Sequence, residues 1–584
     1  VMPARRVLPL ALVAFVAACS SWRPPAPPPE PAPVPPGPPD DVFQKPAPKK
    51  RPNTPAARFA AARDRILDRW LADEPSHARE LGLHAADGKI GDYSAAGLRA
   101  RYARVAKERK ELAAFDKEKL SPDDALDRAI LENQADVYLF EGQDLETWRH
   151  KPDFYQELFS VNDYLDRDYA PVAERAAKLL AHEKAALAAV PYVRENLVSP
   201  MSKPVLETAI KIYRGYAEYL RSDVPKQLKG VGTPAFQAEL ATTNDALAKA
   251  ASALADWMEK SELPKGDQSH VLGPARFQKL LAAQEGLKIS LAEFKRMGEA
   301  DLAANQKLYD KLASRARVKR PKASELFAAA QALTERARQF VAEKRFATIP
   351  GDQKLVVKET PPFQRWNSAF LSAPGPFEKK TTTAFYYITL PDPKWSKKDQ
   401  AEYVMPTGVL LSTTIHETYP GHFLQELFID RAPTRVEKSI ASYSFVEGWA
   451  HYGEQAMIEL GFGGDDPANQ LGQVSDALLR DCRYLVSLGI HTEGMTLKQA
   501  ERKFMTDCKQ DKATAREQAA RGAFDPGYFA YTLGKLQILA LRDEAKKKLG
   551  PKFDLAKFHD ALLSHGSPPV PLLRERVLSD LGAK

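Results

Sequence analysis

A pair of histidines separated by Pro-Gly constrains the fold of this chain more than any other feature. His416-Glu417 and His422 have the residue types of a hydrolytic metal site, in which two imidazoles hold a cation and a glutamate serves as general base. In the usual arrangement the histidines lie four residues apart on one face of a helix, whereas an interval of six separates them by roughly 240°. Proline lacks a backbone donor and glycine tolerates unusual dihedral angles. We therefore predict that Pro420-Gly421 breaks the helix after Tyr419 and returns His422 to the site.

A second polar stripe follows soon after the histidines. By itself a His-Glu pair falls at a helix end by chance as often as it marks a site, so the second signal matters. Glu447, His451 and Glu454 are spaced i, i+4 and i+7 in an otherwise apolar run, which places them on one face of a buried helix. Buried carboxylates need partners, and a metal ion is one such partner.

Both stretches, H-E-x-x-P-G-H-x-x-Q and E-G-W-A-x-Y-x-E, resemble motifs of the bacterial family catalogued as domain of unknown function 885. That family is regarded as a group of gluzincin-like zinc metallopeptidases, whose third metal ligand is a glutamate on a second helix. The resemblance covers nearly all of 55–584. It implies one Zn²⁺ per chain, with Glu417 as general base. The implied ligands are His416, His422 and Glu447.

The same resemblance implies roles for residues outside these ligands. Glu454 would orient a ligand histidine. His451 lies one turn from Glu447, and the alternative is that it is a ligand, but the family pattern does not require histidine there, so we expect it near the metal without holding it. The oxyanion that develops during amide hydrolysis needs a donor, for which the candidates are Tyr531 and His491. Tyr528, one turn before Tyr531 on the same helix face, would contact substrate. Three basic residues at family positions either bind a substrate carboxylate or form structural ion pairs: Arg483, Arg521 and Arg542.

The first residues have the pattern of a lipoprotein signal peptide, 1–18. Arg5-Arg6 precede the apolar run Val7–Ala18, which is too short to span a bilayer and leads into Cys19 in a sequence that resembles a bacterial lipobox. We expect cleavage after residue 18 and lipid attachment to the Cys19 thiol. The alternative is an ordinary signal peptide with an incidental cysteine. Ser20 in place of aspartate favours the outer membrane, facing the periplasm or the cell surface.

Residues 19–54 form the predicted link between the lipid and the fold. Residues 24–53 contain fourteen prolines, a composition that cannot build a core and that favours an extended polyproline II chain. At about 3.1 Å per residue, this segment reaches up to roughly 90 Å. We expect it to act as a tether that holds the folded part away from the membrane.

Charge and cysteine content limit the partners. The net charge is +8, but the basic residues are dispersed and no glycine-rich phosphate loop or ribonucleoprotein motif accompanies them, so nucleic acid is not an expected partner. Positive charge suits proximity to the anionic polymers of a cell envelope. Besides Cys19 the chain has Cys482 and Cys508, and their separation in sequence leaves open whether they pair. The oligomeric state is likewise open.

Helical periodicity runs through almost all of the chain after residue 55. The pattern changes at 350–395, where prolines punctuate short β-prone runs, of which Thr381–Leu390 is the best. We predict a mainly α, zincin-like metallopeptidase domain over 55–584, with a helical scaffold lobe at about 55–345 and a catalytic part at about 346–584. The small β element should lie beside the active-site helix, either as an edge that pairs with substrate or as a purely structural strand.

These patterns predict zinc-dependent hydrolysis of peptide bonds by a lipid-anchored envelope protein, with a peptide substrate and the bilayer as partners. The arginines indicate a carboxypeptidase or an oligopeptidase. Two alternatives stay open: a non-catalytic envelope binding or assembly protein with a metallopeptidase-like fold, and a hydrolase of peptidoglycan peptide amides. An intact Glu417 beside His416 argues against the first, because a binding protein has no use for a general base.

Overall fold

The computed structural model describes residues 54–360, 365, 368–380 and 383–583 of the chain. The predicted signal peptide, Cys19 and the tether up to residue 53 lie outside the described residues, as do the first two residues of the strand predicted at 381–390. Residues from Asn53 onward belong to one compact unit. Among the described helices, none combines the length and the apolar character needed to cross a bilayer.

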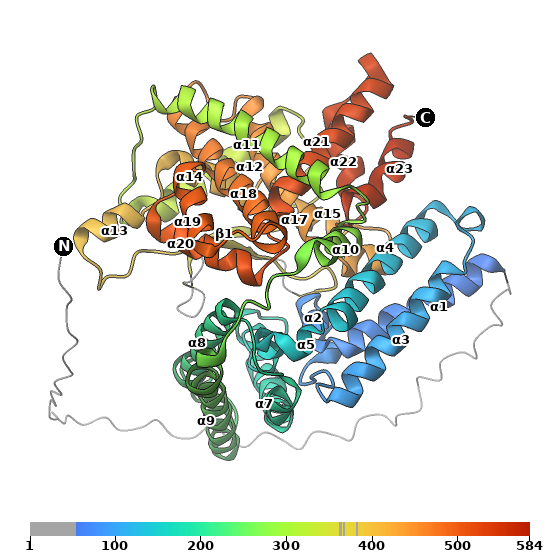
Figure 1. Cartoon of the computed structure of the whole chain (residues 1–584), viewed down its shortest axis with the longest axis vertical. Helices are drawn as coiled ribbons and strands as arrows, with labels where there is room; N and C mark the ends of the chain where they lie inside the picture. Colours follow the sequence, from blue (N-terminus) through green and yellow to red (C-terminus); the bar gives the residue numbers. More distant parts are fainter. Residues whose placement is uncertain (1–53, 361–364, 366–367, 381–382, 584) are drawn as a thin grey trace, which may run out of the picture. The chain divides into compact units, whose positions relative to one another are not determined.

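Long helices make up most of the N-terminal half, coloured blue to green in Figure 1. Residues that favour helix starts begin several of them: Ser121 Oγ accepts a hydrogen bond from the backbone N–H of Asp124, and Pro122 occupies the first turn. The helices of this half are α1 (Pro55–Asp73), α2 (Pro75–Glu80), α3 (Ala95–Ala113), α4 (Pro122–Leu139), α5 (Thr147–His150), α6 (Asp163–Asp166), α7 (Val172–Asn196), α8 (Lys203–Gln227), α9 (Pro234–Trp257), α10 (Gly273–Glu285), α11 (Leu291–Ala313) and α12 (Leu326–Glu343).

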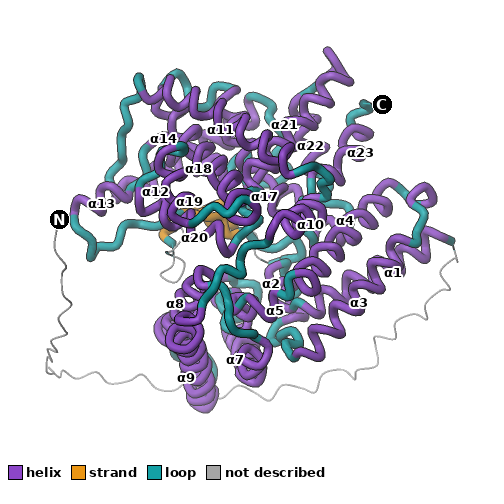
Figure 2. The backbone as a smooth tube through the Cα atoms, in the orientation of Figure 1, coloured by secondary structure: helices purple, strands orange, loops and turns teal. Residues whose placement is uncertain are grey.

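Helices also dominate the C-terminal half, and Figure 2 shows how little strand interrupts them. The predicted mainly α fold class is therefore confirmed. The helices of this half are α13 (Lys397–Tyr403), α14 (Thr407–Glu417), α15 (His422–Ile429), α16 (Arg435–Ser439), α17 (Tyr443–Glu459), α18 (Pro467–Thr492), α19 (Leu497–Thr506), α20 (Lys512–Phe524), α21 (Ala530–Leu549), α22 (Leu555–Leu563) and α23 (Val570–Asp580).

A small sheet lies between the two runs of helices in sequence. Its strands are β1 (Leu355–Glu359), β2 (Ala369–Ser372) and β3 (Ala384–Ile388), in the spatial order β1-β3-β2, with β1 parallel and β2 antiparallel to β3. β3 corresponds to the strand predicted at 381–390. β3 pairs with a strand on each side, so of the two alternatives the free edge for substrate is excluded and the structural strand remains. β2 is an edge strand of the sheet and contacts α14, the helix that carries His416 and Glu417.

Apolar packing joins helices that lie far apart in the sequence. α7, α8 and α9 pack around one apolar core, which includes Tyr155 and Tyr213. The helices α1 and α4 instead share a core with the C-terminal helices, so that Trp70 and Trp449 belong to the same cluster. The first helices of the chain therefore support the C-terminal helices directly.

Four helices that pack against one another position the candidate site: α14, α17, α18 and α21. α17 and α21 approach most closely at Gly448 and Gly534, where a Cβ on Gly448 would lie 2.4 Å from the Gly534 Cα. A side chain at either position would push the helices apart. This contact sets the distance between the helix that carries Glu447 and the helix that carries Tyr531.

Candidate metal centre

The helix that carries His416 ends near the predicted break. α14 ends at Glu417, α15 begins at His422, and the Tyr419–Pro420 peptide bond between them is cis. A Cβ on Gly421 would lie 1.8 Å from the His416 carbonyl oxygen, so only glycine fits there. The imidazole rings of His416 and His422 lie with their centroids 4.6 Å apart. The predicted break is confirmed, although the helix ends two residues earlier than expected.

The turn after α14 is held by α17. The indole Nε1–H of the fully buried Trp449 donates a hydrogen bond to the carbonyl oxygen of Pro420 over 2.8 Å. Trp449 lies two residues after Glu447 on the same helix. One helix therefore fixes the shape of the turn and also presents a carboxylate to the histidines on either side of it.

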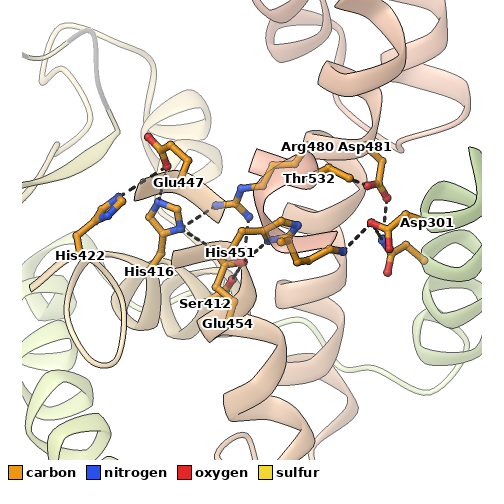
Figure 3. A network of polar contacts seen from close by, with 12 residues as sticks. Asp301, Ser412, His416, His422, Glu447, His451, Glu454, Arg480, Asp481 and Thr532 are labelled. Carbon is orange, nitrogen blue, oxygen red and sulfur yellow. Dashed lines mark hydrogen bonds and ion pairs between the residues drawn. The ribbon is translucent and has the colours of Figure 1, made fainter. Parts of the chain in front are cut away.

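His416, His422 and Glu447 converge on one point, as Figure 3 shows. Glu447 Oε2 lies 3.2 Å from His416 Nε2 and 3.7 Å from His422 Nε2, and the three candidate ligand atoms all lie within 4.8 Å of one another. Two ligands of a tetrahedral zinc ion are about 3.3 Å apart. Glu447 Oε2 is buried and has no hydrogen bond of suitable geometry. Two imidazole nitrogens and an oxygen that meet in this way fit a divalent cation, and this donor set suits zinc.

The charges of the triad also favour a cation. Burial opposes a charge on His416, but the carboxylates of Glu447 and Glu454 outweigh burial and raise its pKa to about 10. Burial and the neighbouring charge of His416 lower the pKa of His422 to about 4. Glu447 is buried, yet the two histidines hold its pKa at about 2. The carboxylates of Glu447 and Glu454 therefore stabilise one positive charge among these side chains.

Glu454 fixes the orientation of His416. Its Oε1 accepts a hydrogen bond from His416 Nδ1 over 2.7 Å, which leaves Nε2 facing Glu447. Arg480 Nη1 donates to Glu454 Oε2 over 2.9 Å, and Arg480 Nη2 lies 3.3 Å from His416 Nδ1. Arg480 was not predicted as a site residue. The sequence carried no signal of its role, which depends on α18 packing against α14.

His451 supports Glu454 rather than the triad. Its Nδ1 lies 3.4 Å from Glu454 Oε2, and its Nε2 is buried with no hydrogen-bond partner among the described residues. Burial lowers the pKa of His451 to about 3, so the ring is neutral. In Figure 3 a second buried polar group lies on the far side of His451 from His422, where Asp481 accepts a hydrogen bond from Thr532.

Glu417 occupies the position expected of a general base. It lies at the end of α14 directly after His416 and is 8% exposed. Burial raises its pKa to about 7, with Glu447 contributing in the same direction and His416 opposing. The backbone N–H of Leu371 on β2 donates to its carboxylate. The edge strand and the candidate base are therefore in contact.

Two predicted arginines and one predicted tyrosine gather beside the triad. The Tyr531 ring lies between guanidinium groups, with Arg483 at 4.7 Å and Arg480 at 5.6 Å from its centroid. The Tyr443 hydroxyl donates to the Tyr531 hydroxyl over 3.4 Å and accepts a hydrogen bond from Arg521 Nη2 over 2.7 Å. Tyr443 itself lies one turn before Glu447 on α17, which links this group to the candidate metal ligands.

Three other predicted site residues lie elsewhere. His491 is eleven residues after Arg480 on α18, about 16 Å along the helix, and its Nε2 contacts the Gly522 carbonyl oxygen. Tyr528 is fully buried in an apolar core with its hydroxyl unpartnered among the described residues. Arg542 donates to the Tyr452 hydroxyl. The structure does not bring these side chains to the triad.

Cys482 and Cys508 form a disulfide with an S–S distance of 2.06 Å. The bond ties α18, which carries Arg480 and Arg483, to the residues that follow α19. The question that the sequence left open is therefore answered: the two cysteines pair.

Known proteins resemble this chain over most of its length. Its structure is similar to that of a candidate lipoprotein of unknown function from Shewanella oneidensis, with a TM-score of 0.73 and 25% identity over 89% of this chain and 99% of that chain. A candidate lipoprotein from Colwellia psychrerythraea has the same TM-score and 20% identity over 91% of this chain and 100% of that chain, and shares the fold. No curated protein matches. Residues 75–577 match the family described as bacterial protein of unknown function (DUF885), and the chain belongs to that family.

Proposed function

We propose that this protein is a zinc-dependent peptidase of the bacterial cell envelope, with a zincin-like site in a mainly α fold. The observation that carries the proposal is the convergence of His416, His422 and Glu447 across a broken helix. The first two ligands are six residues apart and the third comes from another helix, so local helix geometry alone does not produce the cluster. Gly421 allows the tight turn between the two histidines, and Trp449 holds that turn through its hydrogen bond to Pro420.

Zn²⁺ held by these three residues would supply a Lewis acid for a substrate carbonyl and lower the pKa of a water molecule toward 7. Glu417 lies next to the ligands and would take a proton from the attacking water and return it to the leaving amine. Glu454 keeps His416 in the tautomer that presents Nε2. Tyr531 is the candidate donor to the developing oxyanion, since its ring lies against Arg480, which contacts His416.

β2 is the candidate docking edge for an extended peptide. It is an edge strand, and the N–H of Leu371 reaches Glu417. A peptide that added to this edge would have its backbone aligned by hydrogen bonds close to the general base.

Two observations support an envelope location with lipid attachment at Cys19. The disulfide between Cys482 and Cys508 suits an oxidising compartment rather than the cytosol. The two similar structures are described as candidate lipoproteins. Attachment to the outer membrane is part of the same proposal.

Metal content tests the proposal first. We expect one zinc per chain by mass spectrometry in the purified protein and none in the His422→Ala variant. Absence of zinc from the unaltered protein after zinc is supplied would overturn the proposal and favour a binding protein.

Activity is the second test. A Glu417→Gln variant should keep its zinc and lose hydrolysis of peptides, whereas unchanged turnover would exclude Glu417 as the base. Peptides and peptidoglycan fragments should be offered side by side, because cleavage of the fragments alone would move the substrate to cell-wall amides.

A further inference from the structure

A buried arginine without an acidic partner lies beside the candidate metal centre. Arg483 is only 9% exposed, and its Nε donates to Gln518 Oε1 over 2.8 Å. Its guanidinium lies against the Tyr531 ring. Within the described part of the chain, no carboxylate forms an ion pair with Arg483. A buried charge normally has a partner of opposite charge, so an anion is missing from this place.

The neighbouring arginines do not share this property. Arg480 pairs with Glu454 over 2.9 Å, and Arg521 pairs with Asp525 over 3.1 Å. Burial, together with the positive charges of Arg521 and Arg480, lowers the pKa of Arg483 below its ordinary value. Among these three arginines, Arg483 is therefore the one whose positive charge no described carboxylate balances.

The free edge of the Arg483 guanidinium suits a carboxylate. Gln518 uses Nε, which fixes the plane of the group and leaves Nη1 and Nη2 as the parallel pair of donors. Such a pair binds a carboxylate through two hydrogen bonds. Tyr531 supports one face of the guanidinium, so the group is held in place before a ligand arrives.

Arg483 is linked to the triad through Tyr531 and Arg480. The guanidinium carbons of Arg483 and Arg480 lie 4.7 Å and 5.6 Å from the Tyr531 ring centroid, and Arg480 Nη2 lies 3.3 Å from His416 Nδ1. Successive residues of an extended peptide are about 3.8 Å apart. A carboxylate on Arg483 would therefore place one of the last few peptide bonds of the substrate near the triad.

We propose that Arg483 binds the C-terminal carboxylate of the substrate, which makes the enzyme a carboxypeptidase that removes one or a few residues from a free C-terminus. The proposal rests on the proposed peptidase function and names the substrate class of that site. An acidic side chain is the other source of a carboxylate, and the experiment separates the two.

Binding is measured first, because it does not depend on turnover. The probe is a library of N-acetylated pentapeptides, made once with a free C-terminal carboxylate and once with a C-terminal amide. Titration calorimetry on the zinc-loaded Glu417→Gln protein should show the acid library binding about 30-fold or more tightly than the amide library. Equal affinity, or no binding of either library, overturns the proposal. Selective binding of amidated peptides that contain Asp or Glu overturns the C-terminal assignment.

Substitution of Arg483 then identifies the residue responsible. Arg483→Met should remove the preference for the acid library, and Arg483→Lys should restore part of it, because lysine keeps the charge but not the paired donors. Arg296→Met, at an exposed arginine on α11, is the matched control and should leave the preference unchanged. Retention of the full preference in Arg483→Met, with zinc content and helicity unchanged, overturns the assignment to Arg483.

Kinetics on the unaltered protein distinguishes carboxylate binding by Arg483 from the more general proposal that the protein is a peptidase. Equal cleavage of acid and amide peptides that is lost in Glu417→Gln would leave the peptidase proposal standing and overturn the role of Arg483. Cleavage of the acid peptides from their C-terminal end supports both.

Discussion

Two buried carboxylates, Glu454 in the candidate metal centre and Glu183 in the helical region α7–α9, have opposite surroundings. Both are fully buried. Glu454 contacts Arg480, His416 and His451, and these three residues hold its pKa well below the ordinary range in spite of burial. Neither oxygen of Glu183 has a hydrogen-bond partner among the described residues, and burial alone raises its pKa to about 8.

The difference shows that burial of a charge does not by itself mark a site. Glu183 gives no reason to expect a ligand, since burial raises its pKa above neutral pH and so favours the uncharged carboxyl. Glu454 stays ionised and keeps a histidine in one orientation. The set of partners distinguishes the region that can do chemistry from the region that only packs.

The largest effect is expected from Glu454→Gln. The change leaves Arg480 buried without an acidic partner, which costs about 3–5 kcal/mol of unfolding free energy. It also releases His416, so zinc affinity should fall about 10–100-fold. Urea unfolding and competition with a zinc chelator measure the two quantities. Glu459→Gln, an exposed position on the same helix, should change neither. A stability loss below 1 kcal/mol would mean that the partners of Glu454 are replaceable.

The disulfide distinguishes the same two regions in a second way. The bond closes a separation of 26 residues in the region of α18, whereas α7–α9 has no cysteine. A Cys482→Ser, Cys508→Ser double variant should lose about 3.5 kcal/mol, because the unfolded chain gains freedom. Urea unfolding with and without a reductant measures this loss. The unaltered protein should fall to the level of the variant when reduced, and a variant as stable as the oxidised protein would contradict the prediction.

The convergence of His416, His422 and Glu447 could be predicted from the sequence because its signals are local. Pro420-Gly421 dictates a break through the dihedral angles of two residues, and the spacing of Glu447 and Glu454 dictates one helix face. Arg480 could not be predicted, because its role depends on α18 lying against α14, a contact between residues 64 positions apart. The central place of β3 likewise depends on which strands pair, which a β-prone run does not reveal.

The tyrosines show where helical spacing stops being informative. Tyr528 and Tyr531 are three residues apart, yet Tyr528 precedes the start of α21 and enters an apolar core, while Tyr531 lies between arginines. The sequence predicted the mainly α class, since periodicity is a local property. The grouping of α1 and α4 with the C-terminal helices is a long-range property and was not predicted.

Glu183→Gln tests whether the buried Glu183 makes the stability of the protein depend on pH. The pKa of Glu183 is about 8 in the folded protein against an ordinary value of 4.5, so the folded protein keeps a proton that the unfolded chain loses between these values. Stability should therefore fall as pH rises through this window, by about 3 kcal/mol between pH 5 and pH 8. The variant lacks this component, which urea unfolding at the two pH values would reveal. Exposed Glu174→Gln on the same helix should behave as the unaltered protein, and an identical pH dependence in Glu183→Gln would show that Glu183 ionises freely.

Ser412→Ala gives the smallest expected effect and tests whether the hydrogen-bond partners of Glu454 stabilise it independently of one another. Ser412 is fully buried and donates to Glu454 Oε2 over 3.3 Å, the longest hydrogen bond from a hydroxyl or guanidinium to that carboxylate. His416 and Arg480 remain when it is removed, so we expect a loss of about 1 kcal/mol in urea unfolding and unchanged zinc affinity. Ser475→Ala, which removes a half-buried hydroxyl bonded to a helix carbonyl, is the control for loss of a serine hydroxyl. If Ser412→Ala instead costs as much as Glu454→Gln, the partners act as one cooperative network, and the double variant should then be no worse than either single change.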